Sequence, residues 1–388
     1  MLSNISDNVV KISAAGSGKT WDICCEALEL ANKGQASLIT TYTNRGLESV
    51  KDQIRKQNRG VLHSGITIRT WESFLFNEMI KPYQNYVTNE INKIDAIDFN
   101  GIYGVTNFQK RGSVQRYLTS DNNVIYNQLA EFAYVLNEKS KEKVIHRLEK
   151  IYTHIFIDEI QDLTGYDINL IELLMDSSIG VTCCGDNKQA TYSTHNTKKN
   201  KNKSGTNIWF FFNAYKKKGQ LIFEKKLQSR RFNQQICDFA NKIAPAGDLI
   251  ETVMNEETEH DGVFLISQVD ISSYQETFHA QALRYDVRSK DYGLFTINFG
   301  KCKGETFERV LIICNGPLKK FLLKQVKLDS PEKYYVAVTR PKYSLAIILD
   351  RLPQKVENFC ETIIVTKRGP IKAMKFISSF SSTENMNK

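Results

Sequence analysis

An apolar run, a loop of small residues and a helix-like segment follow one another in "KISAAGSGKTWDICCEAL" (residues 11–28). Gly16 and Gly18 let backbone N–H groups approach an anion closely, at a helix N-terminus that favours negative charge. The Lys19 ammonium would reach the outer phosphates of a nucleotide, and the Thr20 hydroxyl would bind Mg²⁺. Ser13 stands where the strict pattern has Gly. The segment predicts a strand, a loop and a helix with a phosphate site at Ala15, Gly16, Ser17, Gly18, Lys19 and Thr20.

A second apolar run ends in two acids, in "FIDEIQDL" (156–163). Buried carboxylates are costly unless a cation or donors meet them, so these acids are either a solvated strand end or part of a site. Ligands bind at the carboxyl ends of parallel strands, and phosphoryl transfer needs a carboxylate for Mg²⁺ and a base for water. We therefore expect Asp158 to bind the metal and Glu159 to act as the base, on a strand adjacent to the phosphate-loop strand.

Apolar runs of strand length alternate with segments of helical periodicity along the chain. They occupy residues 8–13, 36–43, 151–158, 180–186, 221–227, 293–298, 310–314 and 345–349. Such alternation predicts α/β architecture with parallel sheets covered by helices on both faces. We expect a first domain formed by residues 1–70 and 151–215, a small helical insertion at 71–150, and a second domain at 216–388.

The composition is that of an ordinary globular protein, with 388 residues, 41% apolar and 24% charged. No apolar run approaches the roughly 18 residues of a membrane helix, and no signal peptide opens the chain. We therefore expect a cytoplasmic protein with no membrane partner. The eight cysteines show no zinc-site spacing, which favours reduced thiols.

The net charge of +9 is concentrated in one segment. Residues 198–231 contain eleven Lys or Arg and one acid, Glu224. Such a stretch is either a solvated face or the binding surface for a polyanion. The sequence leaves both interpretations open.

Eight motifs, taken in order, resemble those of superfamily 1 helicases of the UvrD/Rep type. They are "AAGSGKT" (14–20), "TTYTNRGLESVKDQI" (40–54), "TIRTWESF" (67–74), "FIDEIQDL" (156–163), "GDNKQATY" (185–192), "LQSRRF" (227–232), "KGETFERVLI" (303–312) and "YVAVTR" (335–340). The resemblance covers most of the chain. It implies two RecA-like P-loop domains and an ATP hydrolase that uses ATP and Mg²⁺.

The resemblance also implies roles for residues outside the phosphate loop. Arg231 and Arg340 would neutralise the charge that spreads over the γ-phosphate during hydrolysis. Gln189 would sense that phosphate or its attacking water. Relatives often have Arg after the loop Thr and Tyr before the first motif arginine. Here Trp21 and Arg230 take those two positions, and a base can stack between an aromatic ring and a guanidinium either way. We expect these two residues to clamp the adenine.

In relatives, single-stranded DNA crosses the tops of both domains, with bases stacked on aromatic rings. The residues that the resemblance places there are Thr43, Asn44, Thr70, Trp71, Phe74, Tyr192 and Lys303. It also implies DNA rather than RNA and movement from 3′ to 5′. Full-length relatives insert a large subdomain where this chain has only about 60 residues, between Arg231 and Thr296. The chain would then be a minimal translocase or helicase.

Two other functions stay open. The chain could be a DNA-stimulated ATPase switch that regulates a partner nuclease in an anti-phage defence complex, in which case it would hydrolyse ATP without unwinding DNA alone. It could instead be a P-loop enzyme acting on a small molecule, in which case hydrolysis would ignore DNA.

Overall fold

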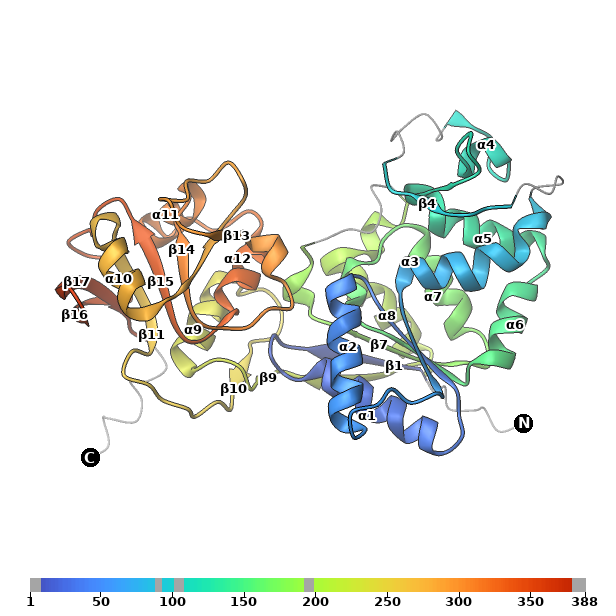
Figure 1. Ribbon diagram of the computed structural model, residues 1–388, viewed down its shortest axis with the longest axis horizontal. Helices are drawn as coiled ribbons and strands as arrows, with labels where there is room; N and C mark the ends of the chain where they lie inside the picture. The colour runs from blue at the N-terminus through green and yellow to red at the C-terminus, as the bar shows by residue number, and fades with distance from the viewer. Residues whose placement is uncertain (1–7, 88–92, 101–107, 192–198, 379–388) are drawn as a thin grey trace. The chain divides into compact units, whose positions relative to one another are not determined.

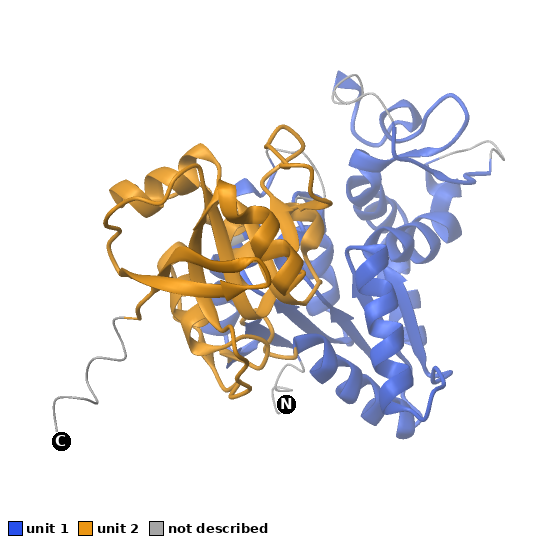
Figure 2. Ribbon diagram, turned by 60° about the vertical axis from the view of Figure 1, so that its left-hand side comes forward, with its two compact units in different colours: residues 1–13, 19–225 blue, residues 14–18, 226–388 orange. Residues whose placement is uncertain are grey.

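A computed structural model describes residues 8–87, 93–100, 108–191 and 199–378. The chain forms two compact units, each with its own β-sheet (Figures 1 and 2). Unit 1 contains residues 1–13 and 19–225, and unit 2 contains residues 14–18 and 226–388. The predicted α/β class, with parallel sheets flanked by helices, is confirmed.

The sheet of unit 1 has six strands in the order β3-β2-β6-β7-β1-β8. Their bounds are β1 Val9–Ser13, β2 Ser37–Thr41, β3 Ile66–Thr70, β6 His154–Ile157, β7 Gly180–Gly185 and β8 Ile222–Lys226. The pairs of β2 with β3 and β6, and of β7 with β6 and β1, are parallel. Two expectations need correction. The strand before the acids, β6, is separated from the phosphate-loop strand β1 by β7, and β8 joins this first sheet, where Ile222 N donates to Asn8 O at 2.9 Å.

The two faces of this sheet are covered by different helices, because successive strand residues point to opposite sides. Helices α1 (Lys19–Asn32) and α2 (Asn44–Gln57) pack on one face, against Ile39, Phe156 and Cys184. The other face, with Leu38, Ile155 and Cys183, belongs to a larger core. That core includes residues of α3 (Trp71–Phe74), α5 (Leu129–Lys139), α6 (Lys143–Ile151), α7 (Tyr166–Met175) and α8 (Ile208–Lys217). The insertion therefore shares the hydrophobic core of the sheet.

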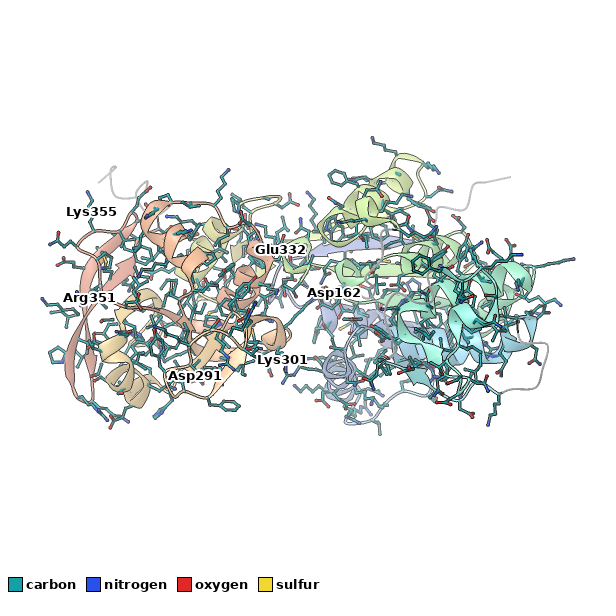
Figure 3. The ribbon with its side chains drawn as sticks, turned by 90° about the horizontal axis from the view of Figure 1, so that it is seen from above. Asp162, Asp291, Lys301, Glu332, Arg351 and Lys355 are labelled. Atoms are coloured by element: carbon teal, nitrogen blue, oxygen red, sulfur yellow. The ribbon has the colours of Figure 1, made fainter. Side chains whose placement is uncertain are left out.

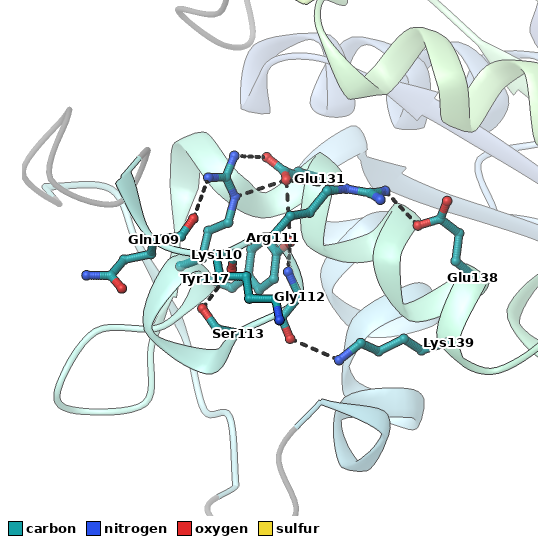
Figure 4. Close-up of polar contacts among 10 residues, drawn as sticks. Gln109, Lys110, Arg111, Gly112, Ser113, Tyr117, Glu131, Glu138 and Lys139 are labelled. Atoms are coloured by element: carbon teal, nitrogen blue, oxygen red, sulfur yellow. Dashed lines mark hydrogen bonds and ion pairs between the residues drawn. The ribbon is translucent and has the colours of Figure 1, made fainter.

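The insertion at 71–150 is less regular than its predicted helical pattern. It contains η1 (Leu75–Ile80), η2 (Lys81–Tyr86), α4 (Val114–Tyr117), η4 (Tyr126–Gln128) and a short parallel ribbon of β4 (Ile97–Asp98) and β5 (Val124–Ile125). Ion pairs fasten one of its loops to α5 (Figure 4). Arg116 Nη2 lies 2.8 Å from the buried Glu131 carboxylate, and Arg111 Nη2 lies 2.6 Å from Glu138. Pairing offsets the cost of burying Glu131.

The sheet of unit 2 has seven strands in the order β13-β12-β14-β15-β11-β17-β16. They are β11 (Gly262–Ser267), β12 (Gln281–Arg284), β13 (Thr296–Asn298), β14 (Phe307–Ile313), β15 (Pro341–Leu349), β16 (Phe359–Thr366) and β17 (Gly369–Phe376). The strands from β13 to β11 are parallel, while β17 runs antiparallel to both β11 and β16. The sheet is mixed at this edge, where the sequence predicted parallel strands throughout.

Helices and a short ribbon complete unit 2. They are α9 (Gln234–Ile243), α10 (Ile271–Phe278), α11 (Gly316–Lys324), α12 (Pro331–Val338), and β9 (Gln228–Ser229) with β10 (Glu251–Thr252). Separate apolar cores cover the two faces of the sheet: Val263, Val310 and Leu345 lie in one, and Phe264, Leu311 and Ala346 in the other. Charged side chains of the segment after β15, such as Arg351 and Lys355, point outward (Figure 3).

Three further features bear on the sequence analysis. Among the described residues, none of the helices combines the length and apolar character needed to cross a membrane. All eight cysteines are free thiols in the structure. Of the basic segment, Lys199 and Lys203 lie over the rings of Tyr166 and Phe211 in their own unit, at 4.4 and 5.7 Å.

Candidate nucleotide site and nucleic-acid groove

The first turn of α1 meets the acids that follow β6. Thr20 Oγ1 donates to Asp158 Oδ2 at 3.2 Å, and Lys19 Nζ lies 3.0 Å from Glu159 Oε1. The loop glycines let the chain turn from β1 into α1, with φ of +75° at Gly16 and +88° at Gly18. Unit 1 thus brings together four residues that the sequence placed in one site from two motifs well over a hundred positions apart.

Burial and charge act against each other at these groups. Burial alone would lower the pKa of Lys19, but the carboxylates of Glu159, Asp158 and Asp186 outweigh it and raise that pKa above its ordinary value. Burial and the neighbouring Glu159 raise the pKa of Asp158 to about 6, partly offset by the Lys19 ammonium. A concentration of buried charge of this kind is typical of functional sites.

Gln161 connects the acids after β6 to the end of β7. Its amide nitrogen donates to Glu159 Oε2, and its amide oxygen accepts a hydrogen bond from Asp186 N at 3.1 Å. Asp186 Oδ2 in turn accepts from the amide of Gln189 at 2.7 Å. Gln161 and Asp186 stand inside the quoted motifs, but the sequence analysis gave neither a role. The sequence holds no signal for this bridge, because the bridge depends on β6 and β7 being neighbours in the sheet.

Two backbone features fix this arrangement. Glu159 has a left-handed φ of +57°, which is uncommon for a residue other than glycine and often marks a functional site. Gly185 ends β7 directly beside Gln161. A Cβ at Gly185 would overlap Gln161 Oε1 and lie 2.7 Å from Ile160 Cγ2, so only glycine leaves room for the bridge.

The loop residues 14–18 pack within unit 2 against the segment that follows β9. Arg230 N donates to Gly16 O at 2.9 Å. A Cβ at Gly16 would lie 2.5 Å from Arg231 Cβ and 2.7 Å from Ser229 Oγ. Ala14 and Ala15 belong to the second hydrophobic core. The small residues of this loop are therefore needed for close packing as well as for anion approach.

The two predicted arginines of unit 2 meet at Thr339. Arg231 Nη1 donates to Thr339 O at 3.2 Å, and Arg340 Nη2 donates to Thr339 Oγ1 at 3.1 Å. Arg340 is only 1% exposed, and its guanidinium also donates to Val336 O and Glu305 O. Thr339 is a residue that the sequence analysis missed, although it directly precedes a motif arginine.

The adenine clamp pairs residues of different units. Trp21 lies on α1 in unit 1 and is 52% exposed, so its indole is open to a stacking partner. Arg230 is an exposed residue of unit 2. Stacking of adenine between Trp21 and Arg230 stays a prediction, as does contact of Arg231 and Arg340 with a phosphate.

The residues present fit a magnesium nucleotide. A Thr hydroxyl and a carboxylate are oxygen ligands, which Mg²⁺ prefers, and Mg²⁺ in nucleotide sites takes few protein ligands beside phosphate and water. The Ser17 hydroxyl in the loop is buried and has no hydrogen-bond partner within the described chain. A phosphate oxygen would give that hydroxyl an acceptor.

A separate groove of about 570 Å³ lies in unit 1, beside the ends of β2 and β3. Residues that line it are Tyr42, Thr43, Asn44, Thr70, Glu72, Ser73, Phe76, Asn77, Ala96, Ile97 and Phe99. Three of the predicted DNA-binding residues are among them: Thr43, Asn44 and Thr70. Thr43 and Thr70 cap helices by accepting hydrogen bonds from Gly46 N and Ser73 N, at 3.0 and 3.2 Å.

The other predicted DNA-binding residues fare differently. The prediction for Trp71 and Phe74 is wrong as regards base stacking, because the two rings are 1% and 0% exposed and lie in the core. The Trp71 indole N–H donates to Asp167 Oδ1 at 2.7 Å, which explains its inward orientation. Lys303 is a half-buried residue of unit 2 that follows η10 (Phe299–Cys302). Tyr192 lies outside the described residues.

Comparison with known proteins supports the motif analysis. Residues 77–204 match the family described as UvrD/REP helicase N-terminal domain, a range that contains Asp158, Glu159 and Gln189. About a third of the chain is thus similar to the N-terminal domain of UvrD/REP helicases. No curated protein matches this chain. Among solved structures, one similar chain comes from a complex of arterivirus nonstructural protein 10, a helicase, with DNA, at 14% identity and a TM-score of 0.47. The similarity covers 91% of this chain and 63% of that helicase.

Proposed function

We propose that this UvrD-like chain is an ATP-dependent translocase or helicase on single-stranded DNA. The observation that carries the proposal is the convergence of Lys19 and Thr20 at the start of α1 with Asp158 and Glu159 after β6. Phosphoryl transfer by a P-loop enzyme needs this combination: a cation for the phosphates, a hydroxyl and a carboxylate for Mg²⁺, and a carboxylate base for water.

Within this site the chain's own residues divide the work. Bound Mg²⁺ would polarise the phosphate that water attacks. Thr20 and Asp158 would hold the metal. Lys19 and Gln161 each bind one oxygen of the Glu159 carboxylate. When the Lys19 ammonium turns to a phosphate, Glu159 Oε1 is released to accept a proton from water, while Gln161 keeps the carboxylate in place.

The residues of unit 2 would act on the charge that develops at the γ-phosphate. Thr339 holds Arg231 by its carbonyl and Arg340 by its hydroxyl, so the two guanidinium groups are oriented as a pair. Arginine is suited to this task because its planar donors match phosphate oxygens. Gln189 donates a hydrogen bond to Asp186, directly after β7, and would change its contacts when a γ-phosphate is bound.

Two observations support single-stranded DNA as the track. The matched family is that of UvrD/REP helicases, and the groove in unit 1 is lined by three residues of the DNA-binding motifs. Movement from 3′ to 5′ rests on the family resemblance alone. The described part of the chain has no feature that favours a nuclease partner in phage defence or a small-molecule substrate.

The test is steady-state ATP hydrolysis by the purified chain, alone and with single-stranded DNA, duplex DNA or RNA. Lys19→Ala and Glu159→Gln should each lower kcat by at least about a hundredfold, since each removes a group that acts on the reacting phosphate or water. The matched controls are Glu29→Gln, at an exposed position on α1, and Lys33→Ala, at the exposed residue directly after α1, and both should hydrolyse ATP normally.

Stimulation by single strands, lost in both site variants and kept in both controls, would support the motor. Hydrolysis that no nucleic acid changes would contradict it. A strand-displacement assay with 3′- and 5′-tailed duplexes then tests unwinding and polarity.

A further inference from the structure

We infer that Phe99, backed by Tyr126, is a base-stacking surface for single-stranded nucleic acid in the groove of unit 1. The inference rests on the proposed function and deepens it, because it names the surface that takes the place of the buried Trp71 and Phe74. Both rings come from the insertion, outside every motif identified in the sequence.

The local structure holds Phe99 in an exposed position on the groove. Ribbon β4–β5 pairs Asp98 with Ile125, and Phe99 and Tyr126 directly follow the ends of these two strands. Asp98 Oδ1 accepts from Asn100 N at 2.8 Å, which fixes the turn after the ribbon. Phe99 lines the groove and is 58% exposed. A large ring held open to water in this way is suited to stack on a partner.

Tyr126 supports that ring and connects it to the motif residues. The ring centroids of Phe99 and Tyr126 are 5.1 Å apart, with 34° between their planes. The Tyr126 hydroxyl lies 3.3 Å from the Tyr42 hydroxyl and 3.4 Å from Glu72 Oε1. Tyr42 and Glu72 also line the groove, so the aromatic pair is anchored to the segment that carries Thr43 and Thr70.

The groove offers one kind of chemistry to bases and another to phosphates. Phe99 presents an apolar face and Glu72 a carboxylate, and a carboxylate repels phosphate. The hydroxyls of Thr43 and Thr70 each accept an amide N–H, which leaves the hydroxyl hydrogen to be donated to a phosphate oxygen. Asn44 adds a side-chain amide donor. A single strand provides both exposed base faces and phosphates, whereas a duplex keeps its base faces stacked inside.

The experiment measures binding of a fluorescent oligothymidylate by anisotropy, for the full chain and its variants. Phe99→Ala should weaken binding by roughly 5- to 150-fold, the effect of losing one stacked base. Phe99→Trp should restore it. Phe108→Ala is the matched control, since Phe108 belongs to the same insertion, is 92% exposed and does not line the groove. Thermal unfolding and ATP hydrolysis without DNA should be unchanged in all three variants.

An abasic strand of equal length separates stacking from phosphate binding. Wild type and Phe99→Ala should bind it equally, because it offers no base to stack. The inference is overturned if Phe99→Ala binds oligothymidylate as tightly as Phe108→Ala does, or loses equal affinity for the abasic strand or for a duplex. If the wild type binds single strands and Phe99→Ala is unchanged, this inference alone fails. If the wild type binds no single strand, the proposed function fails with it.

Discussion

Replacement of Gly185 by Ala is a sharp test of the bridge between Glu159 and Asp186. Gly185 has no left-handed φ, so its backbone conformation accepts alanine. The added Cβ would overlap Gln161 Oε1 and lie 2.7 Å from Ile160 Cγ2. The glutamine amide is the more adjustable of the two and would move. Its hydrogen bonds to the Glu159 carboxylate and from Asp186 N would then be lost.

The structure sets the size of the effect. Gln161 is completely buried, so its displaced amide cannot exchange these bonds for water. A hydrogen bond to a charged group contributes about 1.5–3 kcal/mol, and crowding a packed core costs about 1–3 kcal/mol more. If the lost hydrogen-bond energy of about 1.5–3 kcal/mol raises only the free energy of the transition state, kcat falls by roughly 10- to 150-fold. The KM for ATP should change by less than about threefold, since Lys19 and Thr20 keep their positions.

The assay combines ATPase kinetics with urea unfolding in a double-mutant cycle with Gln161→Ala. In the Gln161→Ala variant the glutamine amide is already absent, so the added Cβ of Gly185→Ala has no amide to displace. The effect of Gly185→Ala on kcat should therefore be smaller there than in the wild type, by a coupling free energy of at least about 1 kcal/mol. Gly316→Ala is the control, because a Cβ there meets no atom within 4 Å. A stable Gly185→Ala protein with normal kcat, or fully additive effects on kcat, would refute the bridge as a positioning device for Glu159.

Three further changes have defined outcomes. Thr339→Val removes the hydroxyl that accepts a hydrogen bond from Arg340, and the loss of about one hydrogen bond should lower kcat by roughly 3- to 10-fold. The contact of Arg231 with the Thr339 carbonyl is kept in this variant. Thr339→Ser should restore kcat. Trp71→Phe removes a donor to the buried Asp167 carboxylate and should lower the free energy of unfolding, measured in urea, by about 1.5–3 kcal/mol. The affinity for single-stranded DNA should stay unchanged, because the buried Trp71 ring does not stack on bases. Burial, Arg309 and Lys375 lower the pKa of His260 from 6.5 to about 3, so the unfolded chain binds a proton that the folded chain excludes as the pH falls below 6.5. Stability should drop by about 1 kcal/mol per pH unit between pH 6 and 4, and a urea series with His260→Gln should be flatter over that range.

The sequence predicts best those features that depend on neighbouring residues in the chain. Strands β1, β2, β6, β7 and β14 were expected from their apolar runs, because strands buried on both faces are apolar throughout. The hairpin of β16 and β17 was not expected, since alternate residues there are exposed and no continuous apolar run marks it. Strand β12 has only four residues, Gln281–Arg284, two of them polar at its ends.

The parts of the site that depend on strand order were beyond reach of the sequence. Lys19, Thr20, Asp158 and Glu159 could be grouped because phosphate chemistry demands such a set. The bridge through Gln161 could not, because it requires that β7 lie directly beside β6 and that Gly185 leave space at its end. Likewise, nothing in the sequence indicates that Thr339 would accept hydrogen bonds from two motif arginines at once.

The buried ring of Trp71 shows why a motif can keep its position while one of its side chains takes a different role. Thr43 and Thr70 are both helix N-caps, so these two motifs require a hydroxyl at the point where a strand turns into a helix. Capping by Thr70 fixes where α3 begins, and the first helical residue, Trp71, then faces the core and donates to Asp167. The hydroxyls stay at the groove because the caps are there. A stacking ring is not tied to a helix cap in this way. It needs only an exposed position beside the groove, and Phe99 on the insertion has such a position.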